Sequence, residues 1–284
     1  MEKRGTEVAV MESQVTVPDN GKYQRSNILG IPIDRMTLEE CVAKLDSYIP
    51  TKQPHHVVLV NAAKIVKARY DRDLASIIQT ADLIGADGVP IVWTSRLLGE
   101  PLPGRVNGTD LMERLLELAA KKQYRVYFLG AKPQVIQRAV DLFLKMYPGL
   151  VVAGYRHGYF ESPNDEIQVA EEIGKANADI LLIGMGSPMK EKWVRRHIQR
   201  LNVPVIHGVG GSFDIYGGYT KRAPIWMQKA GLEWLYRIIQ EPRRMWKRYL
   251  TTNAIYIVLT IYELIKKLYA FFIKQTDHVN DFRK

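Results

Sequence analysis

The stretch Ile180-Leu-Leu-Ile-Gly-Met-Gly-Ser-Pro-Met-Lys-Glu191 decides the fold class of this chain. Its first five residues form an apolar run as long as a buried strand, and a glycine-containing turn follows at once. A second run at residues 203–207 leads into a similar turn, Gly208-Val-Gly-Gly-Ser-Phe-Asp214. Short apolar strands that end in a glycine loop before a helical segment are typical of parallel α/β sheets.

The same alternation continues through the body of the chain. Further apolar runs that suit buried strands lie at residues 56–60, 125–129 and 150–155. Helical segments separate them, and Thr37-Leu-Glu-Glu40 opens one of these as a capping box. We therefore predict one α/β domain over residues 26–220, a Rossmann-like parallel sheet covered by helices on both faces.

The composition is compatible with one sizeable core and a reducing compartment. The chain has 284 residues, 46% of them hydrophobic, and a single cysteine, Cys41, which rules out an internal disulfide framework. We expect no secretory signal, and residues 1–25 are predicted to be a disordered extension because they are polar and lack periodicity. The net charge is +10, and 13 basic against 5 acidic residues place +8 of it within residues 221–284. A basic tail of this kind points to an anionic surface, either lipid or nucleic acid.

The basic C-terminal region also contains an apolar segment at residues 254–273. Its length would span a bilayer, but three charges interrupt it: Glu263, Lys266 and Lys267. Its aromatic residues include Tyr256, Tyr262 and Tyr269, and the cations before it are Arg243, Arg244, Lys247 and Arg248. We therefore predict that residues 221–284 form a helical, membrane-binding appendage that lies in the interface. The alternative is a basic helix packed on the domain with its charges in water.

Open parallel sheets bind ligands at the carboxyl ends of their strands, so the loops there are the candidate site. Asn61 ends the first run, and Asp87 stands between a strand-like segment and a helix. Asp87 could take a proton from an attacking hydroxyl, or it could be a helix N-cap. Arg105 could steady a leaving diphosphate, or it could form a surface salt bridge. Asp214 is the rival base, although it and Ser212 could instead cap the next segment.

None of the glycine loops matches the spaced dinucleotide fingerprint or the phosphate-binding loop that ends in Gly-Lys-Ser/Thr. A Rossmann dehydrogenase and a nucleoside triphosphatase are therefore poorly supported. Asp71-Arg-Asp73 has the acid-x-acid form with which many glycosyltransferases hold a metal. It lies in a charged helical stretch, residues 64–78, where a solvated helix face is the simpler interpretation.

Taken in order, these loops resemble the WecG/TagA/CpsF family of bacterial glycosyltransferases over residues 28–248. The blocks that carry the resemblance are Ala86-Asp-Gly88, Arg105-Val-Asn-Gly108, Gly158-Tyr-Phe160, Gly184-Met-Gly-Ser-Pro188 with Glu191, Gly208-Val-Gly-Gly-Ser-Phe-Asp214, and Lys221-Arg-Ala-Pro224 through Gly231-Leu-Glu-Trp-Leu-Tyr-Arg237. Several such blocks in one order are more specific than any single block.

The resemblance implies an inverting transferase that needs no metal or other cofactor. Such an enzyme moves a sugar, of the N-acetylmannosamine type or a related hexose, from a UDP-sugar to a polyprenyl-diphosphate-linked acceptor. Known members act in teichoic acid, enterobacterial common antigen and exopolysaccharide assembly. We accordingly expect a cytoplasmic protein, peripheral on the inner face of the plasma membrane, with a homo-oligomer left open and no nucleic-acid partner.

The resemblance also implies which residues form the site. Asp87 matches the proposed catalytic base, Asn61 lies beside it, and Arg105 matches a further active-site residue. We expect donor binding by Gly88, Gly130, Gly184, Gly186, Ser187, Lys190, Glu191, Gly210 and Gly211. We expect acceptor or membrane binding by Arg237, Arg243, Arg244 and Arg248.

Two departures from the family pattern leave the donor's identity open. Members often carry Thr-Pro-Asn where this chain has Leu59-Val-Asn61, and many carry Lys-Gln-Glu where it has Met189-Lys-Glu191. These departures also support an alternative, a catalytically inactive membrane scaffold on the same fold. A nucleic-acid-binding protein is a weaker alternative, because no recognisable nucleic-acid module accompanies the basic tail.

Overall fold

The computed structural model describes residues 24–281, so nearly all of the predicted extension at residues 1–25 lies outside the described residues. The body is a parallel six-stranded sheet in the order β4-β3-β8-β7-β5-β6. Its strands are β3 (His55–Val60), β4 (Leu83–Ala86), β5 (Arg125–Gly130), β6 (Val151–Arg156), β7 (Ile180–Gly184) and β8 (Val205–Gly208). The predicted strands are all present. The run at 203–207 starts late, at Val205, because Pro204 has no N–H to give to the ladder.

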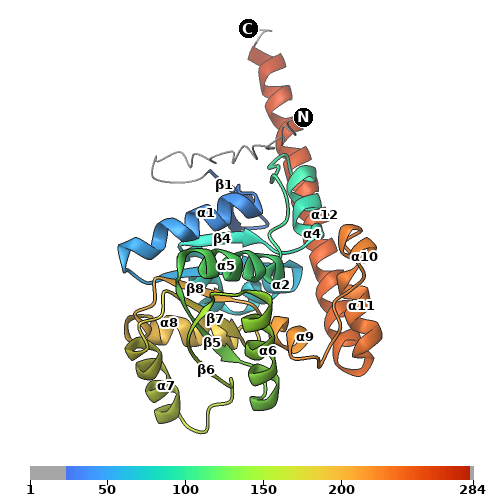
Figure 1. Cartoon of the computed structure of the whole chain (residues 1–284). Helices are drawn as coiled ribbons and strands as arrows, with labels where there is room; N and C mark the ends of the chain where they lie inside the picture. The colour runs from blue at the N-terminus through green and yellow to red at the C-terminus, as the bar shows by residue number, and fades with distance from the viewer. Residues whose placement is uncertain (1–23, 282–284) are drawn as a thin grey trace, which may run out of the picture.

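Helices cover both faces of this sheet, as predicted (Figure 1). One face carries α1 (Leu38–Tyr48), α5 (Gly108–Lys122) and α6 (Pro133–Met146). The other carries α2 (Ala62–Tyr70), α3 (Arg72–Gln79), α7 (Pro163–Lys175) and α8 (Met189–Leu201). The predicted capping box opens α1, where Thr37 and Glu40 bond to each other's backbone N–H groups. The short helix η1 (Ile49–Thr51) follows α1, and α9 (Ser212–Tyr216) follows β8.

A two-stranded hairpin, β1 (Arg25–Ile28) and β2 (Ile31–Asp34), precedes the sheet and was not predicted. Its turn places Leu29 at φ +54°, although leucine is not a usual residue for this conformation. Asp34 Oδ2 accepts the Ile84 N–H of β4 at 2.7 Å. The hairpin therefore occupies a donor on the outermost strand of the sheet, which limits pairing with another chain.

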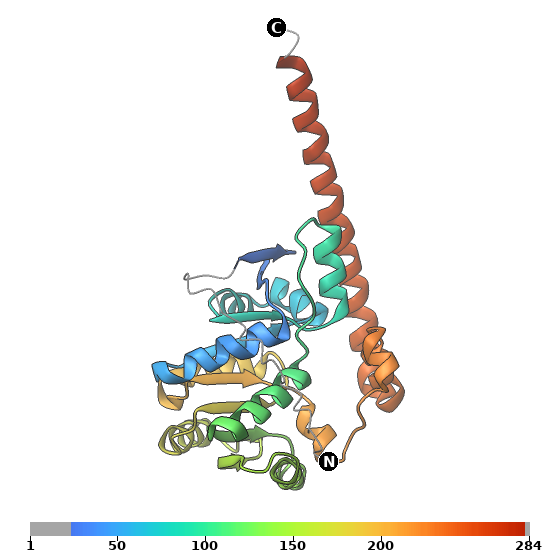
Figure 2. The same ribbon diagram turned by 45° about the horizontal axis from the view of Figure 1, so that its top comes forward.

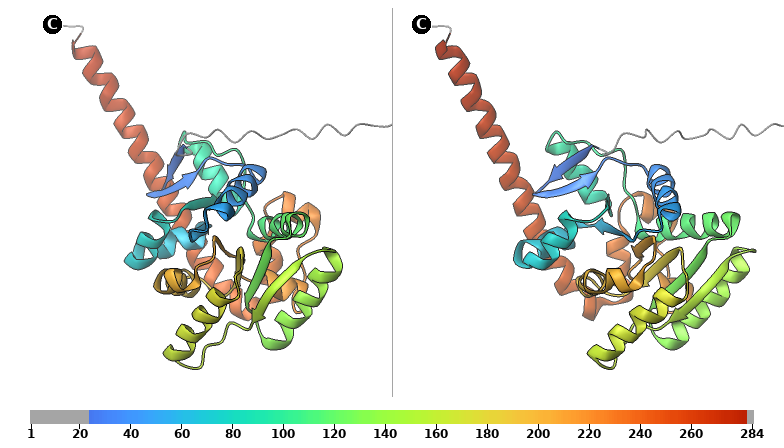
Figure 3. Two further views of the ribbon diagram at one scale, coloured as in Figure 1. Left: turned by 60° about the vertical axis from the view of Figure 1, so that its left-hand side comes forward. Right: turned by 90° about the vertical axis from the view of Figure 1, so that its left-hand side faces the viewer.

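The C-terminal region consists of α10 (Ile225–Lys229), α11 (Glu233–Gln240) and α12 (Pro242–Asp281). The 40 residues of α12 make a helix about 60 Å long that runs beside α4 (Val89–Leu97) (Figures 1 and 3). Tyr256 is buried there and donates to Thr94 Oγ1 at 2.9 Å, and Lys267 Nζ donates to Leu98 O at 2.6 Å. This part of α12 is therefore packed on the domain, as in the alternative, although the charge of Lys267 is bound to the body and does not lie in water. Tyr256 does not belong to an exposed aromatic face.

The opposite side of α12 is apolar and exposed. The residues there that are at least half exposed are Ile257, Val258, Ile261, Tyr262, Ile265, Leu268 and Tyr269. The far end of the helix extends past the body (Figure 2). Among residues 24–281, no helix combines the length and the apolar character that crossing a membrane requires.

We predict that Tyr256 fixes α12 to the body. Tyr256→Phe should lower the free energy of unfolding by about 1 kcal/mol, because the hydrogen bond to Thr94 is lost. Tyr256→Ala should lower it by about 3–5 kcal/mol, because a buried ring is removed as well. Urea unfolding measures both, with the exposed Tyr262→Ala as the matched control. Equal effects of the two alanine substitutions would show that α12 is not docked in solution.

Candidate active site

Asn61 connects the end of β3 to the start of α2. Its Oδ1 accepts the Lys64 N–H at 3.0 Å and caps the helix. With Oδ1 used in this way, the amide Nδ2 faces Asp87 and lies 3.4 Å from its Oδ2. The structure thus brings two predicted site residues together, and the capping bond determines which end of the amide meets the carboxylate.

Asp87 follows β4, and its N–H donates to Val60 O at 2.8 Å, which continues the ladder between β4 and β3. The alternative role as an N-cap is wrong, because Gly88 is the N-cap of α4 and no side chain caps that end. Gly88 has φ +117°, which favours glycine and lets the chain turn into α4 directly after Asp87. The carboxylate is therefore not used by the helix and is half-buried at the carboxyl edge of the sheet.

Arg105 lies in the loop before α5, and its partner comes from the C-terminal region. Its Nη1 donates to Glu233 Oε2 at 2.9 Å, and Asn107 Nδ2 donates to the same oxygen at 3.2 Å. The salt-bridge alternative is thus observed, with side-chain exposures of 22% for Arg105 and 24% for Glu233. Neither Glu233 nor its contact was predicted, although Glu233 stands in the block Gly231-Leu-Glu-Trp-Leu-Tyr-Arg237.

A buried ion cluster lies beneath this edge, between the sheet and helices α2 and α8. Glu191 Oε1 is 2.8 Å from Lys64 Nζ and 2.8 Å from Lys190 Nζ, and Lys64 Nζ also donates to Leu59 O at 2.6 Å. Lys64 was not among the predicted residues. No motif marked it, because lysines are common in helices and the local pattern of α2 does not show that Lys64 is buried.

The burial of this cluster changes its ionisation. Burial alone would raise the pKa of Glu191, but the two ammonium groups hold the pKa of that carboxyl well below its usual range. Burial lowers the pKa of Lys190 to about 8, with Lys64 lowering it and Glu191 and Asp87 opposing. Burial also lowers the pKa of His56 to about 4, so this neighbouring imidazole is neutral at pH 7. The cluster therefore carries one more positive than negative charge close to Asp87.

Two of the predicted donor-binding glycines, Gly130 and Gly184, meet where β5 and β7 end. A Cβ at Gly130 would lie 2.5 Å from Gly184 O, and one at Gly184 would lie 2.3 Å from Phe213 Cδ2. Gly186 and Gly210 have nothing within 4 Å in that direction, and Gly211 is the N-cap of α9. Ser187 Oγ is buried without a hydrogen-bond partner among the described residues. An open glycine backbone beside an unused hydroxyl fits a ligand with several acceptor oxygens.

The acidic residues considered as a metal-binding pair or as a rival base lie in or at the start of helices, outside the Asn61–Asp87 pair. Asp71 caps α3 by accepting the Leu74 N–H at 3.1 Å and pairs with Lys192 at 2.9 Å. The stretch 64–78 is consequently two helices that break at Asp71, and not one as predicted. Gly211 is the N-cap of α9, so Ser212 does not cap this helix. Ser212 Oγ donates to Val209 O at 2.8 Å and lies 2.8 Å from Thr109 Oγ1. Asp214 lies in the first turn of α9. As far as side chains are described, no group of three His, Cys, Asp or Glu residues is arranged to hold a metal ion.

The cations predicted for the acceptor or the membrane lie in α11 and α12. Arg237 and Arg243 are exposed. The side chains of Arg244 and Arg248 lie outside the described part of the structure. From the C-terminal region, the structure brings Glu233 to the Arg105 loop.

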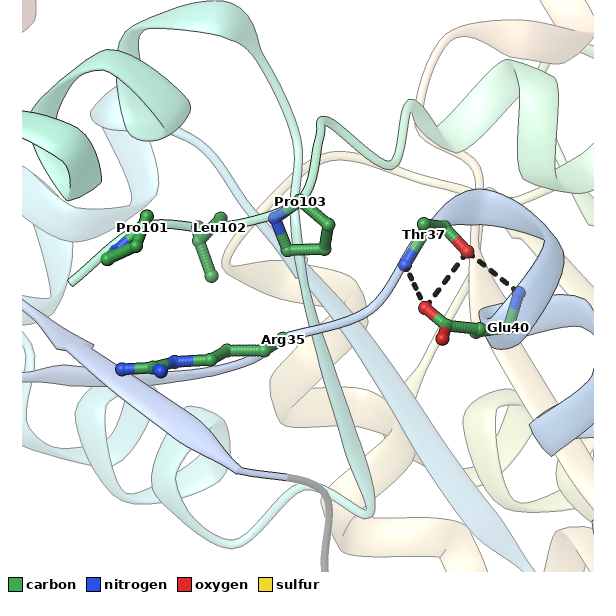
Figure 4. Close-up of a pocket in the computed structure, with 6 residues that line it drawn as sticks. All are labelled: Arg35, Thr37, Glu40, Pro101, Leu102 and Pro103. Carbon is green, nitrogen blue, oxygen red and sulfur yellow. Dashed lines mark hydrogen bonds between the residues drawn. The ribbon is translucent and has the colours of Figure 1, made fainter. Parts of the chain in front are cut away.

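A shallow pocket elsewhere is lined by Arg35, Thr37, Glu40, Pro101, Leu102 and Pro103 (Figure 4). Thr37 and Glu40 form the capping box of α1, and Arg35 pairs with Glu100 at 2.6 Å. Because these polar groups already serve the fold, the pocket offers no evident chemistry.

A family model described as "Glycosyl transferase WecG/TagA/CpsF family" matches residues 26–269. The match covers the sheet, the Asn61–Asp87 pair and most of the C-terminal helices. The chain belongs to this glycosyltransferase family. The matched range, residues 26–269, is longer than the range of the resemblance seen in the sequence, residues 28–248. It includes the part of α12 that packs on α4.

Three similar proteins share the name N-acetylglucosaminyldiphosphoundecaprenol N-acetyl-beta-D-mannosaminyltransferase. The protein of Bacillus subtilis (strain 168) is 36% identical over 229 residues, 80% of this chain and 88% of the relative. That of Bacillus spizizenii (strain ATCC 23059 / NRRL B-14472 / W23) is 33% identical over 72% of this chain and 78% of the relative. That of Staphylococcus aureus (strain MW2) is 30% identical over 82% of this chain and 90% of the relative. This member of the WecG/TagA/CpsF family is accordingly an enzyme of the hexosyltransferase class.

The two departures from the family pattern have different surroundings. Leu59 is buried, and a Cβ at Gly85 would lie 2.5 Å from its Cδ2, so this side chain fills core space above Gly85. Lys190 crosses the backbone of Gly208, where a Cβ would lie 2.3 Å from Lys190 Cε, and ends at Glu191. Leu59 therefore contributes to packing, and Lys190 contributes a positive charge that is paired with Glu191.

We predict that Lys190 makes stability rise with pH above neutrality. Its pKa is about 8 in the folded protein against 10.5 in an unfolded chain, so between these values the unfolded state binds more protons. Between pH 7 and 10, the free energy of unfolding of the wild type should therefore rise by about 1–3 kcal/mol relative to that of Lys190→Met. Urea unfolding at both pH values measures this, with Lys52→Met, an exposed lysine, as the control. Parallel pH profiles of wild type and Lys190→Met would contradict it.

Proposed function

We propose that this chain transfers an N-acetylmannosamine-type sugar, or a related hexose, from a UDP-sugar to a polyprenyl-diphosphate-linked acceptor, with inversion, in cell-surface polysaccharide or teichoic acid synthesis. The observation that carries the proposal is the Asn61–Asp87 pair at the carboxyl edge of the sheet, in a chain whose relatives are named for this transfer. The relatives' names support N-acetylglucosamine on undecaprenyl diphosphate as the acceptor.

In the proposed reaction Asp87 is the general base. Its carboxylate takes the proton of the acceptor hydroxyl while that oxygen bonds to the anomeric carbon. The bond from the anomeric carbon to the diphosphate breaks on the opposite side, and UDP leaves with the electron pair. Asn61 supports this role because its amide nitrogen faces the Asp87 carboxylate.

The leaving diphosphate needs positive charge and hydrogen-bond donors. Arg105, the excess positive charge of the cluster at Lys64, Lys190 and Glu191, and the backbone amides after β7 can supply both. The acid-x-acid pair at Asp71 and Asp73 is engaged with α3 and Lys192. These observations support a reaction that does not depend on a metal.

The tail supports attachment to a membrane surface. The exposed side of α12 is apolar over more than three turns, from Ile257 to Tyr269, and Lys267 donates to the body instead. Arg243 is exposed near the start of the same helix. An apolar strip beside cations fits the inner leaflet, with its anionic lipids, where a lipid-linked acceptor would be found.

A transfer assay tests the function. The full-length protein is incubated with a panel of UDP-sugars and a short-chain polyprenyl-diphosphate N-acetylglucosamine acceptor, with and without excess chelator. We expect transfer from one UDP-sugar, equal in both conditions. Binding of UDP without any transfer would favour the inactive scaffold. Activity that disappears in chelator and returns with Mg²⁺ or Mn²⁺ would contradict the metal-independent mechanism.

We predict that Asp87→Asn keeps the fold and UDP-sugar binding but lowers kcat by at least about 10²-fold, because the general base is lost. Asp73→Asn, an exposed aspartate 82% accessible, is the matched control and should retain wild-type kcat. Single-turnover kinetics and calorimetry measure the two effects. A near-wild-type rate for Asp87→Asn would move the base to Asp214.

We predict that Val258→Asp with Ile265→Asp releases the protein from anionic vesicles. Removing the tail would be a poorer test, because Tyr256 and its neighbours cover part of the core. Both substitutions lie on the exposed side of α12 and should leave the unfolding midpoint unchanged. Wild-type binding should also weaken with salt, since surface charges are screened within about 8 Å at physiological ionic strength. Leu144→Asp on α6 is the control, and undiminished sedimentation of the double variant would contradict the interfacial role.

A further inference from the structure

Glu233, the first residue of α11, is held in one place by two separate parts of the chain. Its Oε2 accepts from Arg105 Nη1 at 2.9 Å and from Asn107 Nδ2 at 3.2 Å. The side chains of Arg105 and Glu233 are about three-quarters buried. One carboxylate oxygen from the C-terminal region thus joins two polar side chains of the loop before α5.

The orientation of Asn107 in this contact is fixed by α5. Its Oδ1 caps the helix by accepting the Thr109 and Asp110 N–H groups at 2.9 and 3.3 Å. The amide nitrogen is the remaining polar end, and it points to Glu233. Asn107 therefore acts as a fixed support for the carboxylate, as Asn61 does for Asp87.

The backbone before Glu233 is fixed as well. Gly231 has φ +72°, and a Cβ there would lie 2.8 Å from the Cβ of Val89, the residue after Gly88. The next residue donates its N–H to Met227 O at 2.8 Å, and Met227 is buried. The turn between α10 and α11 is thus packed against the start of α4, beside the Asp87 loop. Glu233 is delivered to Arg105 by a rigid turn, which distinguishes it from a surface residue that meets an arginine by chance.

We propose that Glu233 is a positioning residue for the transfer reaction, one that acts by aiming the guanidinium of Arg105 at the leaving diphosphate. The proposal rests on the function proposed above. A guanidinium has five N–H donors, and the bond to Glu233 uses one at Nη1, which leaves the others for phosphate oxygens. Glu233 itself touches no reacting atom. Its negative charge also balances Arg105 until the diphosphate binds.

Misplacing a catalytic group by about 1 Å can cost about 10²-fold in rate. Because the diphosphate gains charge as it leaves, the loss of an aimed guanidinium should act on kcat more than on KM. We expect Glu233→Ala to lower kcat by about 10²-fold, and the isosteric Glu233→Gln, which retains an acceptor oxygen, by about 10-fold. The KM for the UDP-sugar should change less than about threefold in both.

The experiment is a double-mutant cycle in the full-length enzyme. Wild type, Glu233→Gln, Arg105→Ala and the double variant are compared for kcat and KM, with the exposed Glu117→Gln on α5 as the control. If Glu233 acts through Arg105, the double variant should be no slower than Arg105→Ala alone. Thermal unfolding confirms that each variant is folded. If Glu233→Ala does not fold, the isosteric Glu233→Gln still provides the test.

The outcomes separate the two proposals. An inactive wild type would overturn the transfer function and, with it, the role of Glu233. With an active wild type, an unchanged kcat in Glu233→Gln would overturn the positioning role alone. Losses that multiply in the double variant would overturn it too, because they would show that Glu233 acts independently of Arg105. A kcat loss that disappears in the Arg105→Ala background supports it.

Discussion

The buried carboxylate of Glu191 is the interaction on which the candidate site depends. It lies at the start of α8 and has two ammonium partners at 2.8 Å, Lys190 on the same helix and Lys64 on α2. A carboxylate that is only 1% exposed is stable only where such partners replace its water. The distance between α2 and α8 is therefore set by an ion contact that tolerates little displacement. Because Asn61 is the N-cap of α2, the contact also affects where Asn61 meets Asp87.

This arrangement joins the two parts of the sheet edge that the reaction would use. The proton-accepting part lies after β3 and β4, and the glycine loops for the donor lie after β5, β7 and β8. Lys67, one turn after Lys64, donates to Ser187 O at 2.8 Å and makes a second link between them. The C-terminal region adds a third part through Glu233, on the side of the Arg105 loop. The site is thus assembled from segments far apart in the chain, each held by a charged or capping contact.

The sequence was sufficient for the features that depend on local pattern. The parallel strands are mainly apolar runs, and Asn61 and Asp87 stand directly after two of them, so both were expected at the ligand-binding edge of the sheet. That they lie beside each other was implied by the family resemblance. The hairpin β1–β2 was not predicted because its turn, Leu29-Gly30, lacks the asparagine or aspartate of a typical hairpin turn. Lys64 and Glu233 were not predicted as site residues for a different reason. Their contacts join residues 127 and 128 positions apart in the chain, and nothing in the local pattern of either residue records its partner.

Leu59 makes two positions on neighbouring strands a single packing unit. It is the registered partner of Gly85 across β3 and β4, and its Cδ2 occupies the space that a side chain at position 85 would need, since a Cβ there would lie only 2.5 Å away. Because Cδ2 is the end of a flexible side chain, Gly85→Ala would force Leu59 into another rotamer. Threonine at position 59 has no δ carbons and would remove this contact altogether. The residue by which this chain departs from the family pattern at position 59 is therefore coupled to the glycine opposite it, and the two positions are expected to vary together.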